Sequence, residues 1–372
     1  MEIWVPYGNV ESLLTIQAEN LGEMSDPAPE SHVEELLPVL ESRLAGRDQL
    51  IVCDNKPATA RLLKALAPKI PKDGPIKIYA LAPNKLEEVV PELKGQVLKT
   101  SPATVAVATG DSEQVLTAPL ELTEAGHSRF VLSTGEPDPL FGYIDARAAL
   151  SLGFMNGARR RAYAGREGDE PNFFGETKAH ELAAQMAEKV QDATYGTIVT
   201  RGGEPYSLID GGAKEARGAY PELQPSPAKG IVVGVGGRGY DETFSHTLRL
   251  AVGALRAVRK GGEVVIVGEC RDGIGSKALQ MQSMGRVTDS MLRKGFYEDG
   301  MEEIAYLTKL RENYSVTLLS SLPDLYAAGR FRFRTARNSA QAFERVFAAT
   351  GRSAKLHVFT RAPETVLATA PR

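Results

Sequence analysis

The chain has 372 residues, of which 42% are hydrophobic and 24% charged, and its formal net charge is −3 at pH 7. This composition is that of a folded globular protein, and the charge balance excludes a whole-chain attraction to nucleic acid or to an anionic membrane. No apolar run approaches the roughly 20 residues that span a bilayer, and the first residues lack the pattern of a signal peptide. We therefore expect a cytoplasmic protein with no nucleic-acid partner and no membrane partner.

Short hydrophobic runs alternate with helical patterns along the chain. An N-terminal hairpin is expected over 3–16, with its turn at Tyr7, Gly8 and Asn9. The other expected strands cover 49–53, 76–81, 104–108, 129–133, 196–200, 229–235, 263–268, 315–319 and 355–359. The expected helices cover 32–44, 59–66, 85–93, 177–190, 242–259, 276–284, 302–311 and 340–350. Strands separated by such helices predict βαβ units and mostly parallel sheets, which is the α/β class.

The length exceeds that of one ordinary hydrophobic core and predicts two domains. The segment 221–227, with three prolines in seven residues, is typical of a linker. We therefore expect an N-terminal domain over 1–225 and a C-terminal, Rossmann-like α/β domain over 226–372. The last residues of the chain could return to the N-terminal lobe.

The two cysteines, Cys53 and Cys270, and the five scattered histidines show no metal-binding spacing. Without an export signal, the cysteines are expected to be free, buried thiols. The sequence therefore predicts no metal ligands.

Residues Gly234–Gly239 match the GxGxxG pattern between an expected strand and an expected helix. Glycines let backbone N–H groups approach an anion, and the positive end of a helix dipole favours it. However, the acidic candidate Glu269 follows about 30 residues later instead of about 20, and the expected helix begins only after Asp241. These features favour a glycine turn that carries a substrate-facing loop, with a nucleotide site as an alternative.

Several motifs occur in a distinctive order along the chain. They are Val5–Gly8, Ile51–Lys56, Glu136–Tyr143, Gly236–Asp241 and Lys260–Gly275. Through them the chain resembles the LarA family of nickel-pincer lactate racemases over about residues 3 to 290. The resemblance implies a two-lobed α/β fold, each lobe a mostly parallel sheet flanked by helices, with a ligand cleft between the lobes. It also implies an isomerase that racemises or epimerises 2-hydroxy acids with a lysine-tethered nickel-pincer nucleotide.

The chain departs from the family's pattern at the positions that handle protons and nickel. Asp138 stands where the family has a histidine, and Asp145–Ala148 stands in place of the Gly-Gly-x-Lys that carries the cofactor. The span 155–175, where a nickel-binding histidine should follow, contains none. We therefore predict a divergent member whose nickel-pincer chemistry is altered or lost, and its cofactor is unknown.

The resemblance and the residue types together select the candidate site. Imidazole titrates near neutral pH and can act as base and acid, and guanidinium matches a carboxylate bidentately. His246 and Arg249, three residues apart, fall on one helical face and correspond to the family's glutamine and lysine. The catalytic candidates are His246, Asp138 and Asp241, and the substrate-binding candidates are Arg249, Lys56, Gly236 and Gly237. Asp241 could instead cap the following helix.

Three functions remain open at this stage. The first is a lactate-racemase-like enzyme for a small anionic metabolite such as a hydroxy acid. The second is a non-catalytic relative that binds a metabolite or a partner, and the third is a nucleotide-dependent enzyme that uses Gly234–Gly239. Separately, Arg330–Arg334 alternates arginine with phenylalanine and is expected to form an edge strand with outward charges.

Overall fold

The computed structural model describes residues 1–71, 74–100, 104–107, 116–166, 168, 171–288, 291 and 297–368. Within this part of the chain, the residues form two compact units. Unit 1 takes the described residues of 1–28, 169–173 and 220–372, and unit 2 takes those of 29–168 and 174–219.

Unit 2 is built on a six-stranded sheet in the order β13-β12-β9-β4-β5-β6. All its neighbouring strands are parallel except β12 and β13. Its strands are β4 (Gln49–Val52), β5 (Lys77–Ala80), β6 (Val97–Leu98), β7 (Thr104–Val107), β8 (Leu116–Pro119), β9 (Arg129–Thr134), β10 (Glu136–Asp138), β11 (Gly142–Ile144), β12 (Ala193–Arg201) and β13 (Glu204–Ile209). Its helices are α1 (Val33–Leu44), α2 (Pro57–Leu66), α3 (Pro83–Val89), α4 (Leu120–Thr123), α5 (Ala146–Phe154), α6 (Ala158–Ala164), α7 (Lys178–Ala187) and α8 (Ala213–Arg217).

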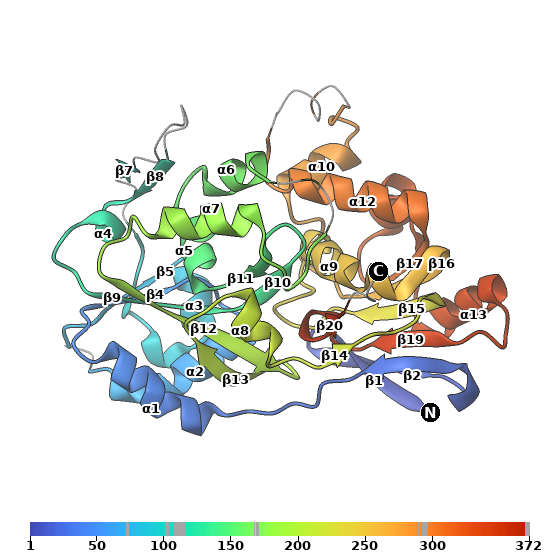
Figure 1. The fold of residues 1–372 in the computed structure, drawn as a ribbon, viewed down its shortest axis with the longest axis horizontal. Coiled ribbons are helices and arrows are strands. Elements are labelled where there is room, and N and C mark those ends of the chain that lie inside the picture. The colour runs from blue at the N-terminus through green and yellow to red at the C-terminus, as the bar shows by residue number, and fades with distance from the viewer. Residues whose placement is uncertain are drawn as a thin grey trace. The chain divides into compact units, whose positions relative to one another are not determined.

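Helices cover both faces of this sheet (Figure 1). Leu50 and Val52 of β4 pack with α1, α2 and α3, whereas Ile51 between them packs with α5, α6 and α7. All three side chains are fully buried. Successive residues of a strand point to opposite faces, so a strand buried on both faces must be hydrophobic at every position. This explains the continuous run that predicted the strand.

Unit 1 is built on a second six-stranded sheet in the order β18-β17-β16-β15-β19-β3, with all neighbours parallel. Its strands are β1 (Glu2–Tyr7), β2 (Val10–Thr15), β3 (Leu21–Ser25), β14 (Glu222–Leu223), β15 (Ala228–Gly234), β16 (Val258–Val267), β17 (Ser315–Leu319), β18 (Arg334–Ala336), β19 (Leu356–Phe359) and β20 (Val366–Leu367). Its helices are α9 (Phe244–Ala251), α10 (Lys277–Ser283), α12 (Met301–Asn313) and α13 (Ser339–Thr350). The hairpin β1–β2 forms with the expected turn and, together with α13, packs on one face of the sheet.

Each sheet has one point at which its strand order reverses. In unit 2, β4 is followed on one side by β5 and β6 and on the other by β9 and β12, so the reversal lies between β4 and β9. In unit 1, β15 is followed on one side by β16, β17 and β18 and on the other by β19. Open α/β sheets bind ligands in the crevice at the carboxyl ends of the strands at this switch point. A binding site is therefore expected at the residues that follow β4, β9, β15 and β19.

The units differ from the expected domains in the placement of the first 28 residues. The chain passes from unit 2 to unit 1 after residue 219, close to the expected boundary at 225. Residues 1–28 belong to unit 1, because β3 pairs with β19 and the hairpin packs against α13. The proline-rich segment 221–227 contains β14, which pairs with β20 near the end of the chain, so both lie in unit 1.

Two local expectations were wrong. The helix expected over 242–259 ends at Ala251 and continues as a 3-10 helix over Val252–Ala257, after which β16 already begins at Val258. Gly253 lowers helix propensity at that break. The edge strand expected over Arg330–Arg334 starts only at Arg334, because Leu325–Arg330 forms a π-helix.

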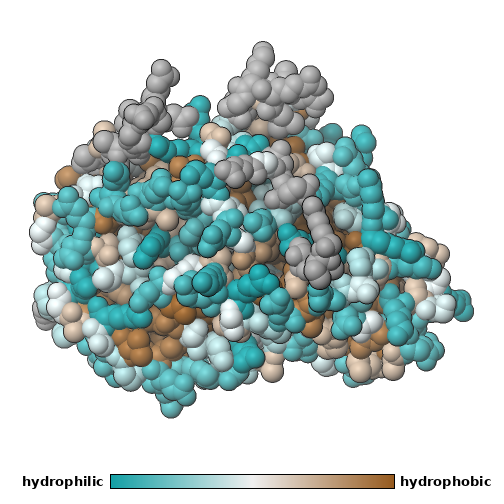
Figure 2. Space-filling view, viewed as in Figure 1, coloured by the Kyte–Doolittle hydropathy of each residue, from teal (hydrophilic) through white to brown (hydrophobic). Residues whose placement is uncertain are grey.

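In the part of the chain that the structure describes, no helix combines the length and hydrophobicity that a membrane crossing requires. Figure 2 shows hydrophilic residues over most of the visible face, with small hydrophobic patches between them.

Candidate functional site

Asp54 organises the switch point of unit 2. Its Oδ1 accepts the N–H of Lys56 at 2.8 Å, and its Oδ2 accepts the N–H of Thr134 at 2.6 Å and the hydroxyl of Ser133 at 2.8 Å. One carboxylate thus ties the end of β4 to the end of β9. Pro57 then starts α2 at its first turn, where its missing N–H costs nothing.

Lys56 and Glu136 form an ion pair beside this brace. The Lys56 Nζ contacts Glu136 Oε2, and the two side chains are only 15% and 5% exposed. A mostly buried ammonium and a mostly buried carboxylate therefore stand together at the carboxyl ends of β4 and β9. The pair offers a donor for an anion and an acceptor for a hydroxyl group.

Asp138 lies in the next turn of the chain and is 1% exposed. Its Oδ1 accepts the N–H groups of Leu140 at 2.8 Å and Phe141 at 3.1 Å, which fixes the turn between β10 and β11. The structure thus gives this side chain a backbone-holding role, and its catalytic role stays a prediction.

Asp145 and His180 form a pair that the sequence did not suggest. The Oδ1 of Asp145 accepts the N–H of Ala148 at 2.8 Å and so caps α5, and its Oδ2 lies 3.3 Å from Nε2 of His180 on α7. Asp145 is 3% exposed. No spacing rule joins two such distant residues, so only the fold reveals the pair.

The residues at the start of α5 can be compared with those that the nickel-pincer cofactor implied by the resemblance would need. A tethered cofactor needs an amine at the start of α5, and the chain has the buried, doubly engaged carboxylate of Asp145 there. The following residues, Ala146–Ala148, contain no lysine. These residues do not fit a lysine-tethered group.

Asp241 organises the switch point of unit 1. It is fully buried, and its Oδ2 accepts the N–H of Gly8 at 2.7 Å and the N–H of Glu269 at 2.9 Å. It does not cap the following helix. Thr243 is the cap of α9 and accepts the N–H of His246 at 3.2 Å. Asp241 is instead needed to join the hairpin turn to the loop after β16, and its catalytic role stays a prediction.

The glycine loop packs closely against the N-terminal hairpin. Gly237 has φ +74°, and a Cβ there would lie 2.9 Å from the Cβ of Pro6 and 3.0 Å from the carbonyl oxygen of Gly8. The N–H of Arg238 is donated to that same carbonyl at 2.9 Å. Tyr240 and Asp241 both donate their N–H groups to the carbonyl of Gly237.

Since the amide of Arg238 is used within the molecule, it is not available to a dinucleotide phosphate. At the other side of the switch point, Arg361 follows β19 and donates from its guanidinium to the carbonyl of Gly236 at 3.0 Å. Gly236 and Gly237 thus shape a turn, and ligand contacts by them stay a prediction.

Two carboxylate oxygens at this switch point have no hydrogen-bond partner among the described residues. They are Oδ1 of Asp241 and Oε2 of Glu269. A Cβ on Gly8, whose φ is +55°, would overlap the Glu269 carboxylate, so only glycine fits there. Burial, and then the nearby Cys270, Glu269 and Asp241, raise the pKa of Tyr7 to about 12. The switch point of unit 1 is therefore rich in hydrogen-bond acceptors.

His246 and Arg249 both lie on α9, as the spacing predicted. Arg249 Nε is 3.6 Å from Glu303 Oε1 of α12, with side-chain exposures of 15% and 2%. Burial raises the pKa of Glu303, an effect that Arg249 opposes. The ring of His246 lies 6.1 Å from that of Tyr240. Arg249 therefore lies beside an internal carboxylate, and the roles predicted for Arg249 and His246 at a substrate stay predictions.

Both cysteines are free and buried, as expected. Burial raises the pKa of Cys270 to about 12 and holds the pKa of Cys53 well above its usual value. Within the described residues, no group of three or more His, Cys, Asp or Glu side chains is placed to hold a metal ion.

The comparisons with known proteins define the class of fold. No protein-family model and no curated protein matches the sequence. Comparison with solved structures shows that the chain has the lactate-racemase-like fold. The expected α/β architecture of mostly parallel sheets flanked by helices is therefore confirmed. The expected ligand cleft between lobes stays a prediction, and so does membership of the family.

One matching structure is the lactate racemase apoprotein of Thermoanaerobacterium thermosaccharolyticum, with a TM-score of 0.77 and 16% sequence identity over 99% of this chain and 100% of that one. Another is a protein of Thermotoga maritima, with a TM-score of 0.59 and 13% identity over 92% of this chain and 99% of that one. At these identities the likeness concerns the fold alone.

Proposed function

We propose that this chain binds a small 2-hydroxy acid at the switch point of unit 2, on a lactate-racemase-like fold and without a lysine-tethered nickel pincer. Lys56 takes the carboxylate of the ligand and Glu136 accepts its hydroxyl group. The observation that carries the proposal is the mostly buried Lys56–Glu136 pair at the carboxyl ends of β4 and β9.

The chemistry of the ligand matches the pair. A 2-hydroxy acid has a negative carboxylate and, on the adjacent carbon, a hydroxyl that can donate. Its entry exchanges one ion pair for two charge-assisted hydrogen bonds, which are stronger than neutral ones. The low exposure of both groups limits competition from water. Asp54 holds the backbone of Lys56 in place, so the ammonium is presented from a fixed loop.

Racemisation by the family's chemistry is not part of this proposal. The family's route to inverting C2 of a 2-hydroxy acid requires an acceptor for the hydride, and the segment that would tether one presents Asp145 in place of a lysine. The isomerase activity implied by the resemblance is therefore proposed to be lost, and the protein acts as a metabolite-binding relative. A nucleotide-dependent function has less support, because the Arg238 amide of the glycine loop is engaged by the hairpin.

Calorimetric titration of the full chain tests the proposal. D-lactate, L-lactate and glycolate are expected to bind, and propionate, which lacks the hydroxyl, is expected to bind at least about tenfold more weakly. The Lys56→Met/Glu136→Gln double variant removes both charges together and is expected to abolish binding while staying folded. The control is Lys64→Met on the same helix, since Lys64 pairs at 3.7 Å with Glu92 at an exposed position.

Three outcomes would overturn the proposal. One is equal affinity for lactate and propionate, and another is equal loss of binding in the Lys64→Met control. The third is a lysine-linked adduct in the intact mass of protein made in a host that produces the nickel-pincer cofactor. That result would restore the racemase hypothesis, whereas a thermal shift with NAD or ATP but not with lactate would favour the nucleotide-dependent one.

A further inference from the structure

A groove of about 480 Å³ lies in unit 1 at the opposite edge of the sheet from the switch point. It is lined by the last turn of α12, by the start of β17 at Ser315, and by the residues that lead into β18 at Arg334. β17 and β18 are parallel, so their first residues share the amino edge of the sheet. The groove is therefore separate from the glycine loop, which follows the carboxyl end of β15.

The arginine–phenylalanine alternation of 330–334 builds one wall of this groove. Phe331 and Phe333 are 0% and 3% exposed and pack on Phe244, with ring centroids 4.7 Å and 5.9 Å away. Arg332 between them is exposed and has φ +59°. A left-handed backbone is unfavourable for a residue with a Cβ, so we attribute this conformation to the packing of the two buried rings. They fix Arg332 at the groove.

Positive charge exceeds negative charge along the groove. Three arginines line it, Arg311, Arg332 and Arg334, against one glutamate, Glu312. Arg334 is paired with the buried carboxylate of Glu263. The side chains of Arg311 and Arg332 have no hydrogen-bond or ion-pair partner among the residues that the structure describes.

The carboxyl-terminal end of α12 repels an anion and so limits the affinity of the groove for one. The carbonyl end of a helix carries partial negative charge, and an arginine in the last turn offsets it. Arg311 occupies that last turn. The surplus charge available to a ligand therefore comes mainly from Arg332, and a ligand with several negative oxygens gains more than one with a single charge.

We infer that this groove is a second binding site, which takes a small phosphate-bearing anion. Guanidinium groups match phosphate oxygens with parallel hydrogen bonds. The hydroxyl groups of Thr308 and Ser315 on the lining supply further donors. The site is independent of the proposed hydroxy-acid site, since all of its lining belongs to unit 1 and that site belongs to unit 2.

The test is a calorimetric titration of the full chain with pyrophosphate, and in parallel with inorganic phosphate, AMP and citrate. Pyrophosphate is expected to bind saturably and more tightly than inorganic phosphate, and added salt should weaken both. Preference for AMP over both phosphates would identify a nucleotide as the source of the phosphate. Citrate binding more tightly than pyrophosphate would overturn the choice of phosphate.

Arg332→Gly is the decisive variant. Glycine suits φ +59°, so this change removes the guanidinium without straining the fold, and the melting temperature should stay equal or rise. The affinity for pyrophosphate is expected to fall at least about tenfold. Arg311→Gln should also weaken binding, with some loss of helix stability.

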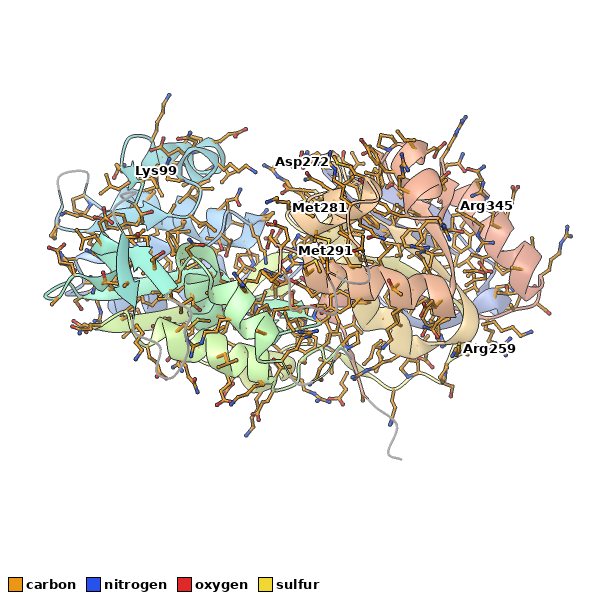
Figure 3. The ribbon with its side chains drawn as sticks, turned by 90° about the horizontal axis from the view of Figure 1, so that it is seen from above. Lys99, Arg259, Asp272, Met281, Met291 and Arg345 are labelled. Carbon is orange, nitrogen blue, oxygen red and sulfur yellow. The ribbon has the colours of Figure 1, made fainter. Side chains whose placement is uncertain are left out.

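The matched control is Arg330→Ala, an exposed arginine of the same motif that does not line the groove. Arg259→Ala, whose side chain extends from the surface of β16 in Figure 3, is a second control. Both should bind pyrophosphate like the unaltered chain. The inference fails if pyrophosphate shows no saturable binding, or if the controls lose as much affinity as Arg332→Gly. Loss of pyrophosphate binding in Lys56→Met/Glu136→Gln would place the anion in unit 2 instead and would also overturn the inference.

Discussion

The two units place the same device at their switch points and surround it with different chemistry. In each, one aspartate accepts backbone N–H groups from neighbouring segments, Asp54 in unit 2 and Asp241 in unit 1. Each also has a buried cysteine nearby in the chain, Cys53 after β4 and Cys270 after β16. The two switch points differ in the other polar groups that lie beside the aspartate.

In unit 2 the remaining groups are a paired ammonium and carboxylate, and in unit 1 they are carboxylate oxygens beside tightly packed glycines. The first arrangement suits the carboxylate ligand proposed above, whereas the carboxylate oxygens of the second would repel such a ligand. A shared topology therefore decides where a site lies, and the side chains at the strand ends decide what it accepts.

The largest expected loss of stability comes from replacing an aspartate, and it should be greater for Asp241 than for Asp54. Asp241→Ala leaves the N–H groups of Gly8 and Glu269 buried without an acceptor and should lower the free energy of unfolding of unit 1 by about 4 kcal/mol. Asp54→Ala should cost about 2 kcal/mol, because Asp54 is only half-buried and water can replace part of its role. Denaturant titration measures both. A larger loss for Asp54→Ala would reverse the comparison.

The ion pair of unit 2 gives the next largest effect. Lys56→Met alone removes the ammonium that faces the mostly buried Glu136 carboxylate and should destabilise the protein by about 3 kcal/mol. Adding Glu136→Gln should recover most of that loss, because no uncompensated charge remains. A thermodynamic cycle from urea unfolding of the four proteins measures the coupling. Additive losses would show that the pair is not energetically coupled.

The glycine loop of unit 1 gives a smaller effect with a close control. Gly237→Ala must both strain a backbone at φ +74° and displace Pro6 and Gly8, for a cost of about 3 kcal/mol. Gly261→Ala, at φ +78° with nothing within 4 Å of the added Cβ, meets only the backbone strain, about 1 kcal/mol. Melting temperatures of the two variants compare them directly. Equal decreases in melting temperature would mean that the hairpin can move away from the added methyl group at little cost.

The two buried thiols should hardly react with a thiol reagent at neutral pH while the chain is folded. Because burial raises the pKa of Cys270 to about 12 and that of Cys53 well above 9.0, neither forms a reactive thiolate in the folded chain at pH 8. Ellman's reagent should therefore label both only after unfolding. Rapid labelling of the folded chain at either position would contradict this.

The same shifts set a dependence of stability on pH. In the unfolded chain the thiols ionise near pH 9.0, whereas the folded chain keeps its protons. The unfolded state thus binds fewer protons above that pH, and the free energy of unfolding falls as the pH rises from about 9 towards 12. Below about pH 9 these two groups contribute no slope. Denaturant midpoints at pH 7, 9 and 10.5 check the sign.

Much of the fold could be predicted because its signals are local. The runs Leu50–Val52, Ile231–Val233 and Val264–Val267 contain only hydrophobic residues, which is what a parallel strand covered on both faces requires. The placement of Lys56 and the glycine loop after such strands followed from the same runs.

Apart from the helix expected over 242–259 and the edge strand expected over Arg330–Arg334, the errors concern contacts between distant parts of the chain. Asp241 precedes a helix and so suggested a cap, but its partners are Gly8 and Glu269, which no local pattern brings together. The pair of Asp145 with His180 escaped for the same reason. Residues 1–28 were assigned to the domain that follows them in sequence, whereas the partner of β3 is β19, more than 300 residues later.

That last pairing has a consequence for synthesis of the protein. As the polypeptide leaves the ribosome, β3 has no neighbour to pair with until Leu356–Phe359 has been translated. Unit 2, whose residues lie almost wholly between these two strands, can fold first while β3 waits. A nascent chain halted before residue 356 should therefore contain a protease-resistant fragment from the middle of the sequence and an N-terminal segment still open to cleavage.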